Sequence, residues 1–151
     1  MSDSQRRARR RPGENRERLI EAGLTEFGLF GYHGASTSSI AARAQVPQPH
    51  VYANFETKQQ LFLACFDRVC DALLAEEQDP DSEGIQRFLF QAVSAAAHPV
   101  LRFALLGSLL ELRDALGDSE FDALLAAGAH SMLRTDADAG ADAKVGADPC
   151  S

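Results

Sequence analysis

The chain has 151 residues, enough for one ordinary domain or two small ones. Its 45% hydrophobic and 25% charged residues exclude a wholly disordered, collagen-like or disulfide-stapled chain. The net charge of −7 is uneven: residues 1–61 carry nine basic and six acidic side chains, a net of +3, whereas residues 62–151 carry six and sixteen, a net of −10. We therefore expect the two halves to meet different partners.

The chain opens with a basic arm, residues 1–12, which holds five arginines between residues 6 and 11 and almost nothing apolar. Such a segment buries too little to fold alone, so we expect it to be flexible. Two interpretations remain open: a solvated tail, or an arm that follows a phosphate backbone or enters a minor groove.

Three helices are predicted next. Apolar residues spaced three and four apart predict the first over residues 15–32, and Gly31 and Gly34 end it. Ser36 has the character of an N-cap for a short second helix. Prolines 47 and 49 fix the start of the third, because proline is tolerated in a first turn. The expected core residues of the second and third helices are Ile40, Ala44, Val46, Val51 and Phe55.

Four further helices follow. Thr57 and Gln60 form a capping box in which each side chain satisfies a free backbone N–H of the fourth helix. A fifth helix is predicted from about residue 85 to before Pro99, a sixth from Pro99 to Gly117, and a seventh from residue 119. The sixth is apolar nearly all round, so we expect the fold, a ligand cavity or a partner chain to cover it.

The last 17 residues, 135–151, contain five alanines and four aspartates and are expected to be a disordered tail. Strand-like alternation and internal repeats are missing from the sequence. The predicted fold class is all-α: an N-terminal three-helix helix-turn-helix domain, then a further helical region with a disordered tail.

The number of cysteines and the hydropathy of the sequence predict a cytoplasmic protein. Three cysteines cannot form a disulfide framework, and the Arg-rich start lacks the apolar segment of a signal peptide. Cys65 and Cys70 are interpreted as small core residues. Arg102 and Arg113 interrupt the most apolar stretch, so we expect no membrane span. We also expect neither a metal nor a cofactor.

The run STSSIAARAQVPQPHVYANFETKQQL, residues 36–61, resembles the DNA-binding domain of TetR-family transcriptional regulators. The preceding FGLFGY, residues 27–32, resembles the end of that family's first helix. The resemblance covers about residues 13–73, which we take as the helix-turn-helix domain. The resemblance further implies that residues 74–134 form an incomplete helical regulatory domain for ligand binding and dimerisation.

The resemblance implies a role for each polar residue around the third helix. Glutamine can pair bidentately with adenine, so a glutamine at the exposed helix start suits base reading. The ammonium and backbone N–H groups at the start of the fourth helix can hold a phosphate. The implied contacts are Gln48 and His50 to base edges, Pro49 to bases or a thymine methyl, Tyr52, Asn54 and Lys58 to phosphates, and Ser38 and Arg43 to further backbone positions.

The sequence departs from the family in three places. Gln45 stands where glycine is usual in the turn, at a cost of about 1 kcal/mol if left-handed. Pro47 replaces a serine cap, forfeiting a hydrogen bond worth about 1 kcal/mol. The Ala/Asp-rich tail stands in place of two long dimerisation helices. This leaves open a naturally short chain, a truncated or frameshifted gene, or dimerisation through the sixth helix.

The resemblance implies a ligand-responsive repressor that binds a pseudo-palindromic operator in double-stranded DNA as a homodimer. Its small-molecule effector is expected among the fourth to seventh helices, at Phe62, Phe66, Phe88, Phe103 and Leu106. The alternative is a truncated member that is inert or pairs with a full-length relative. An enzyme is the weakest hypothesis, because the four histidines are scattered and no catalytic spacing appears.

Overall fold

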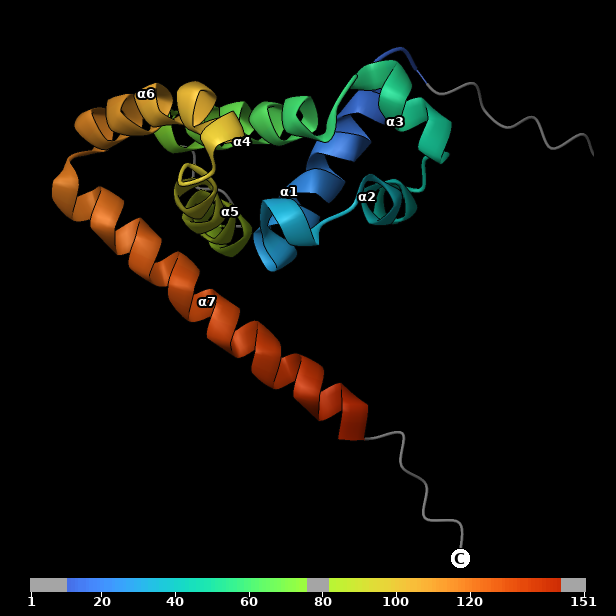
Figure 1. Cartoon of the computed structure of the whole chain (residues 1–151). Helices are drawn as coiled ribbons and strands as arrows, with labels where there is room; N and C mark the ends of the chain where they lie inside the picture. Colours follow the sequence, from blue (N-terminus) through green and yellow to red (C-terminus); the bar gives the residue numbers. More distant parts are fainter. Residues whose placement is uncertain (1–10, 76–81, 145–151) are drawn as a thin grey trace, which may run out of the picture.

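The structure is a computed structural model that describes residues 11–75 and 82–144, with residues 135–144 described by their backbone alone. Within these ranges the chain is all-α, as predicted, and shows seven helices and no strand (Figure 1). They are α1 (Glu14–Gly34), α2 (Thr37–Ala44), α3 (Gln48–Asn54), α4 (Lys58–Leu74), α5 (Ser82–Ala95), α6 (Pro99–Leu116) and α7 (Asp118–Lys144).

Helix α1 is the centre of the molecule. Figure 1 shows α2 and α3 on one side of α1, and α5, α6 and α7 on the other. The predicted end of this helix is confirmed in detail, because Gly31 leaves the helical conformation with φ 75° and ψ 176°. Residues with a side chain rarely adopt a positive φ of this size, so glycine is the residue that allows the kink.

A cluster of aromatic rings joins the first half of the chain to the second. Phe62 of α4 lies between Phe27 of α1 and Phe88 of α5, with both pairs of ring centroids 5.0 Å apart. All three rings are fully buried. Because edge and offset contacts of this kind stabilise an aromatic core beyond simple burial, α1, α4 and α5 share one packed centre.

Helix α5 is clamped between α1 and α7. On one side Gln91 donates a hydrogen bond to the carbonyl of Gly28, at 3.2 Å. On the other, Gly128 of α7 lies so close to α5 that a Cβ there would come within 2.3 Å of the Gln86 carbonyl oxygen. No side chain fits in that space, so glycine allows the two backbones to touch.

Helix α6 is covered on one side only. Leu101, Leu105, Leu109 and Leu112 are buried and face the rest of the molecule. Val100, Phe103 and Leu110 are 56%, 97% and 49% exposed. We expected α6 to be covered on most sides. The fold covers one face of it, and the other face is exposed. No described helix is long and apolar enough to cross a membrane.

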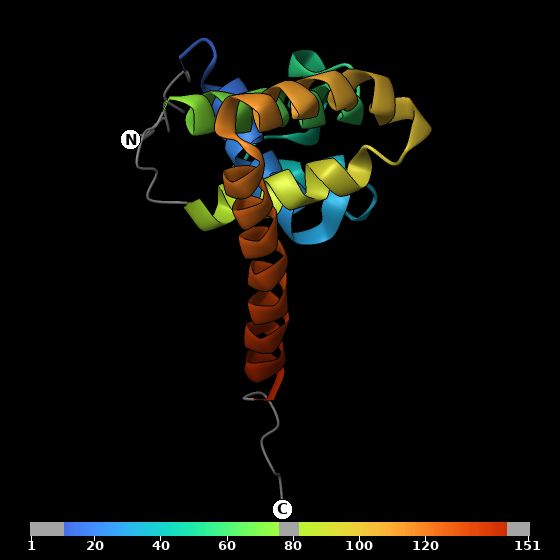
Figure 2. The same ribbon diagram turned by 90° about the vertical axis from the view of Figure 1, so that its left-hand side faces the viewer.

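Helix α7 is longer than the sequence indicated. It continues to Lys144, ten residues into the segment expected to be a disordered tail, and its C-terminal part projects away from the other helices (Figures 1 and 2). The alanines of this segment explain the difference, because alanine has the highest helix propensity of any residue. Residues 145–151 lie outside the described part of the chain.

The start of α4 corrects one local prediction. Thr57 does accept a hydrogen bond from the backbone N–H of Gln60, at 3.1 Å. The Gln60 side chain, however, accepts from the backbone N–H of Glu56 at 3.0 Å, not from that of Thr57. The side chain of Gln60 thus reaches one residue further back, and the reciprocal capping box is replaced by two linked caps.

Candidate nucleic-acid interface

The turn between α2 and α3 is fixed by backbone geometry at its two ends. Ser36 caps α2 by accepting from the N–H of Ser39, whose hydroxyl in turn binds the Ser36 backbone, so the predicted N-cap is confirmed. Gln45 ends α2 in the left-handed region, with φ 54° and ψ 42°, as its place in the turn predicted. Among the described residues it is the only non-glycine with positive φ.

Helix α3 presents its polar side to solvent. Pro47 is its N-cap and supplies no side-chain hydrogen bond, which confirms the predicted loss. Val51 and Phe55 are buried, so they anchor the helix as expected. All the exposed residues of α3 except Ala53 are ones to which the resemblance gives DNA contacts: Gln48, Pro49, His50, Tyr52 and Asn54.

Two of these exposed side chains are held by neighbours. The Nδ2 atom of Asn15, at the start of α1, lies 3.3 Å from Nδ1 of His50. Asn54 Nδ2 donates to the carbonyl oxygen of His50 at 2.8 Å. The imidazole of this exposed residue is therefore oriented before any DNA arrives. An amide nitrogen can only donate, so this contact requires Nδ1 to be the acceptor and Nε2 to carry the proton.

Tyr52 is outside the core. Its ring is 53% exposed, and its hydroxyl lies 3.2 Å from the hydroxyl of Thr37, the first residue of α2. This contact aligns the start of α2 with the end of α3. A tyrosine hydroxyl can donate to a phosphate oxygen while accepting from a threonine, so the arrangement keeps the predicted role chemically possible.

Arg43 lies on α2 but turns toward α1. Its Nε donates to Oε1 of Glu26 at 2.7 Å, and the Glu26 carboxylate is only 7% exposed. The ion pair balances an acid that would otherwise be buried without a partner. Arg43 thus has a structural role that its position in the sequence did not indicate. Ser38, the other predicted contact on α2, is exposed.

Lys58 is also engaged with the protein. Its Nζ donates to the carbonyl of Ala35 at 2.9 Å and lies 4.7 Å above the ring centre of Tyr32. Partial burial lowers the pKa of this ammonium. A lysine ammonium has three donors, so it can bridge the loop before α2 and a phosphate at the same time.

Sequence reasoning missed the contribution of α1 to this surface. Asn15 contacts His50, and the guanidinium of Arg16 lies 5.1 Å from the ring centre of Phe55. A polar residue at a helix start carries no periodic signal, so pattern alone could not have found these two contacts. Of the basic arm, only the last two residues fall within the described part of the chain.

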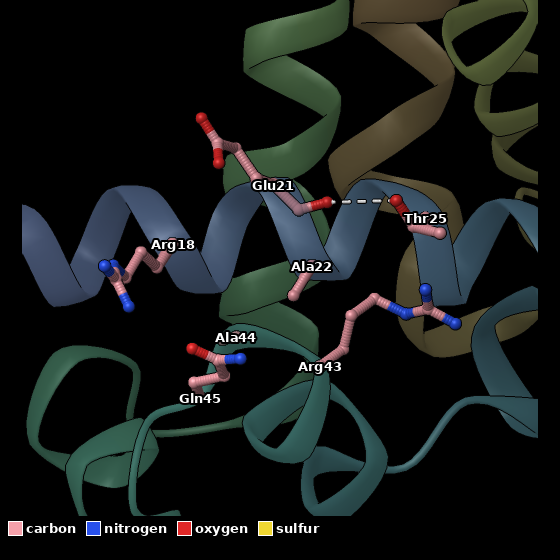
Figure 3. Close-up of a pocket in the computed structure, with 7 residues that line it drawn as sticks. All are labelled: Arg18, Glu21, Ala22, Thr25, Arg43, Ala44 and Gln45. Carbon is pink, nitrogen blue, oxygen red and sulfur yellow. Dashed lines mark hydrogen bonds between the residues drawn. The ribbon is translucent and has the colours of Figure 1, made fainter.

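A hollow of about 490 Å³ lies behind the turn, between α1 and α2 (Figure 3). Arg18 and Arg43 lie at its two ends, and the Thr25 hydroxyl donates to the Glu21 carbonyl at 3.3 Å across one side. No residue of α3 lines it. Both arginines are already in ion pairs, with Glu14 and Glu26, so the hollow offers no surplus charge for a nucleic acid.

The predicted effector residues are not brought together. Phe62, Phe66 and Phe88 are at most 1% exposed and fill the core, whereas Phe103 is 97% exposed. Leu106 lines a surface groove beside α5. Apolar residues at helical spacing are read equally well as core or as cavity lining, and here three of the five are core.

Comparison with known proteins finds sequences similar to the part of the chain that contains α2 and α3. Residues 19–65 match the family model described as "Bacterial regulatory proteins, tetR family". The HTH-type transcriptional repressor SCO4008 of Streptomyces coelicolor is 35% identical over 97 residues, 62% of this chain and 49% of that protein. The HTH-type transcriptional activator FasR of Mycolicibacterium smegmatis is 39% identical over 71 residues, 46% of this chain and 32% of that protein.

A crystal structure titled as a TetR-like transcriptional regulator from Rhodococcus sp. RHA1 is 21% identical and covers 78% of this chain and 82% of that chain, with a TM-score of 0.44. The chain spans about half or less of the length of the curated relatives that it matches.

Proposed function

We propose that the chain is a member of the tetR family of bacterial regulatory proteins, whose model matches residues 19–65, and that it regulates transcription by binding operator DNA with α3. The observation that carries this proposal is the row of exposed polar residues on a short helix whose apolar side is buried by Val51 and Phe55. A helix of this kind enters a major groove with its N-terminal side chains against base edges. The family is one of regulators, so an enzymatic role is not proposed.

Gln48 and His50 are proposed to read bases, with Pro49 against a base or thymine methyl. The phosphate contacts are proposed to come from Ser38, Tyr52, Asn54 and Lys58. The position of each is compatible with this role: Gln48, His50, Ser38, Tyr52 and Asn54 are exposed, and Lys58 is half-buried beside the loop that precedes α2. Arg43 is proposed as a fifth phosphate contact, and its case is the weakest, because Glu26 holds its guanidinium.

The test is binding to the DNA upstream of the protein's own gene, followed by fluorescence anisotropy. Affinity should fall steeply as salt rises from about 50 to 200 mM, because phosphate contacts release counterions. Gln48→Ala should cost about 1–3 kcal/mol and relax preference at one base pair. Leu133→Ala, an exposed change on α7, is the matched control. If the affinity changes neither with salt concentration nor in Gln48→Ala, the proposal is excluded.

We also propose that the protein acts as a ligand-responsive repressor and binds a pseudo-palindromic operator as a homodimer. The repressor SCO4008 aligns over more residues than the activator FasR, which supports repression. A single small helix-turn-helix gains affinity when two half-sites are joined at fixed spacing, which supports a dimer. A reporter driven by the operator should be silenced by the protein, and light scattering should give twice the monomer mass.

A further inference from the structure

A surface groove of about 340 Å³ lies where α5, α6 and the start of α7 meet, at the end of the molecule away from α3 (Figure 1). This volume falls within the range of about 300–1,000 Å³ typical of small-molecule sites. The apolar side chains that form it are Val93, Ala96, Leu106, Leu109, Leu110 and Phe121.

The groove has a buried floor and an apolar rim. Ala96, Leu109 and Phe121 are at most 7% exposed, whereas Val93, Leu106 and Leu110 are 36–49% exposed. Apolar surface in contact with water costs about 25 cal/mol per Å². Burial of these exposed side chains by an apolar ligand would therefore contribute favourably to the free energy of binding.

Arg102, which lines this groove, differs from the other described arginines after residue 61 in its ion pairing. Among the described side chains after residue 61, four arginines lie in ion pairs: Arg68 with Glu17, Arg87 and Arg134 with Glu83, and Arg113 with Asp118. Arg102 is the fifth, and within that described part it has no ion pair, although this half of the chain is strongly acidic. It is exposed and lines the groove.

The two ends of the groove are thus unlike. Arg102 and Arg113 both line it and lie three turns apart on α6, a separation of about 16 Å along the helix axis. Asp118 accepts from Arg113 Nε at 2.7 Å and neutralises that end. A positive charge without a counter-ion remains only at the Arg102 end, with apolar wall between.

We propose that this groove binds an organic acid of medium chain length, whose carboxylate pairs with Arg102 and whose alkyl chain lies along Leu106 and Leu110. Guanidinium groups bind carboxylates through charge-assisted and bidentate hydrogen bonds. This proposal names the effector class of the repressor proposed above, and it rests on that function for its biological meaning but not for the binding itself.

The test uses the whole protein without DNA, so that a failure of operator binding and a failure of this site are distinguishable. Decanoate, 1-decanol and decyltrimethylammonium share one chain length and differ in head group. Titration calorimetry below the micelle concentration should give decanoate about fivefold higher affinity than decanol, the value expected of one exposed charge pair. The cationic probe should bind more weakly than decanol.

Four variants locate the site. Arg102→Gln should bring decanoate down to the affinity of decanol, and Arg102→Lys should restore most of the difference. Arg134→Gln, the same change of charge on α7, should alter neither affinity. Val93→Trp should fill the groove and abolish binding of all three probes, with helix content by circular dichroism confirming that the variant is folded.

Equal affinity for decanoate and decanol, or a decanoate preference that survives Arg102→Gln, would overturn the proposal. Unchanged decanoate binding in folded Val93→Trp would do so as well. A second copy of the chain seated on the groove would give no decanoate binding and a dimer that Val93→Trp dissociates, and this result would also exclude the ligand.

Discussion

Asn15 and His50, 35 residues apart in sequence, place a side-chain amide 3.3 Å from the imidazole nitrogen Nδ1. The start of the first helix thereby orients a residue of the helix that we propose to read DNA. Because the amide donates to Nδ1, Nε2 carries the proton of the neutral ring, and His50 can donate a hydrogen bond through Nε2–H. Donors of this kind suit the major-groove acceptors of guanine, adenine or thymine.

The first prediction follows from this contact. Asn15→Ala should release the imidazole, and nitrogen NMR should show a shift from a dominant Nε2–H tautomer to a mixture. Operator affinity should fall about threefold, as expected for an indirect contribution of less than 1 kcal/mol. Asn15→Gln is the control that retains an amide. An unchanged tautomer in Asn15→Ala would contradict the interpretation.

The second prediction contrasts two glycines within helices. Gly128→Ala places a Cβ against the α5 backbone and should destabilise the protein by about 1–3 kcal/mol. Gly107→Ala meets nothing within 4 Å and should stabilise it by about 0.5–1 kcal/mol, because alanine favours the helix. Urea denaturation measures both free energies of unfolding, and equal effects at the two positions would refute the close α5–α7 contact.

The third prediction separates the two roles of Arg43. Arg43→Met leaves the Glu26 carboxylate buried without its partner and should cost about 2 kcal/mol of stability. The double variant Glu26→Gln with Arg43→Met should recover much of this loss. If Arg43 also contacts a phosphate, the slope of log affinity for the operator against log salt concentration should still be smaller by about 1 in the double variant. A full recovery of stability with an unchanged slope would restrict Arg43 to its structural role.

The fourth prediction concerns the thiol of Cys70. Burial, with Asp67 and Asp71 nearby, raises its pKa from the ordinary 9.0 to about 11. The unfolded chain releases this proton near pH 9 and the folded chain only near pH 11, so the free energy of unfolding should fall as pH rises across that window, by about 1 kcal/mol. Cys70→Ser should remove this part of the alkaline loss. Alkylation of Cys70 should be slow at pH 8 and should accelerate up to about pH 11.

The local features of the fold could be predicted because they depend on neighbouring residues. Ser36 as a cap and the break at Gly31 each follow from the preferences of one residue and its place in a turn, whereas the left-handed Gln45 was expected only from the family resemblance. The same reasoning could not find that Lys58 binds the Ala35 carbonyl or that Arg43 binds Glu26. These contacts join residues 23 and 17 positions apart, which helical periodicity does not connect.

The effector site shows the same limit. Phe62, Phe66 and Phe88 have the spacing expected of a cavity wall, but the packing of α1 and α5 against α4 turns them into core. The residue that distinguishes the groove, Arg102, was notable in the sequence only as an interruption of an apolar run. Its significance depends on which acids reach the other arginines, and that is a property of the folded chain.

The buried cluster of Phe27, Phe62 and Phe88 has a consequence for thermal unfolding. The three rings belong to α1, α4 and α5, so the proposed boundary near residue 73 separates two roles without separating two cores. The helix-turn-helix domain cannot unfold while the later helices stay folded, because both contribute side chains to the same hydrophobic core. Heating should therefore produce one calorimetric transition, in which the van't Hoff enthalpy equals the calorimetric enthalpy.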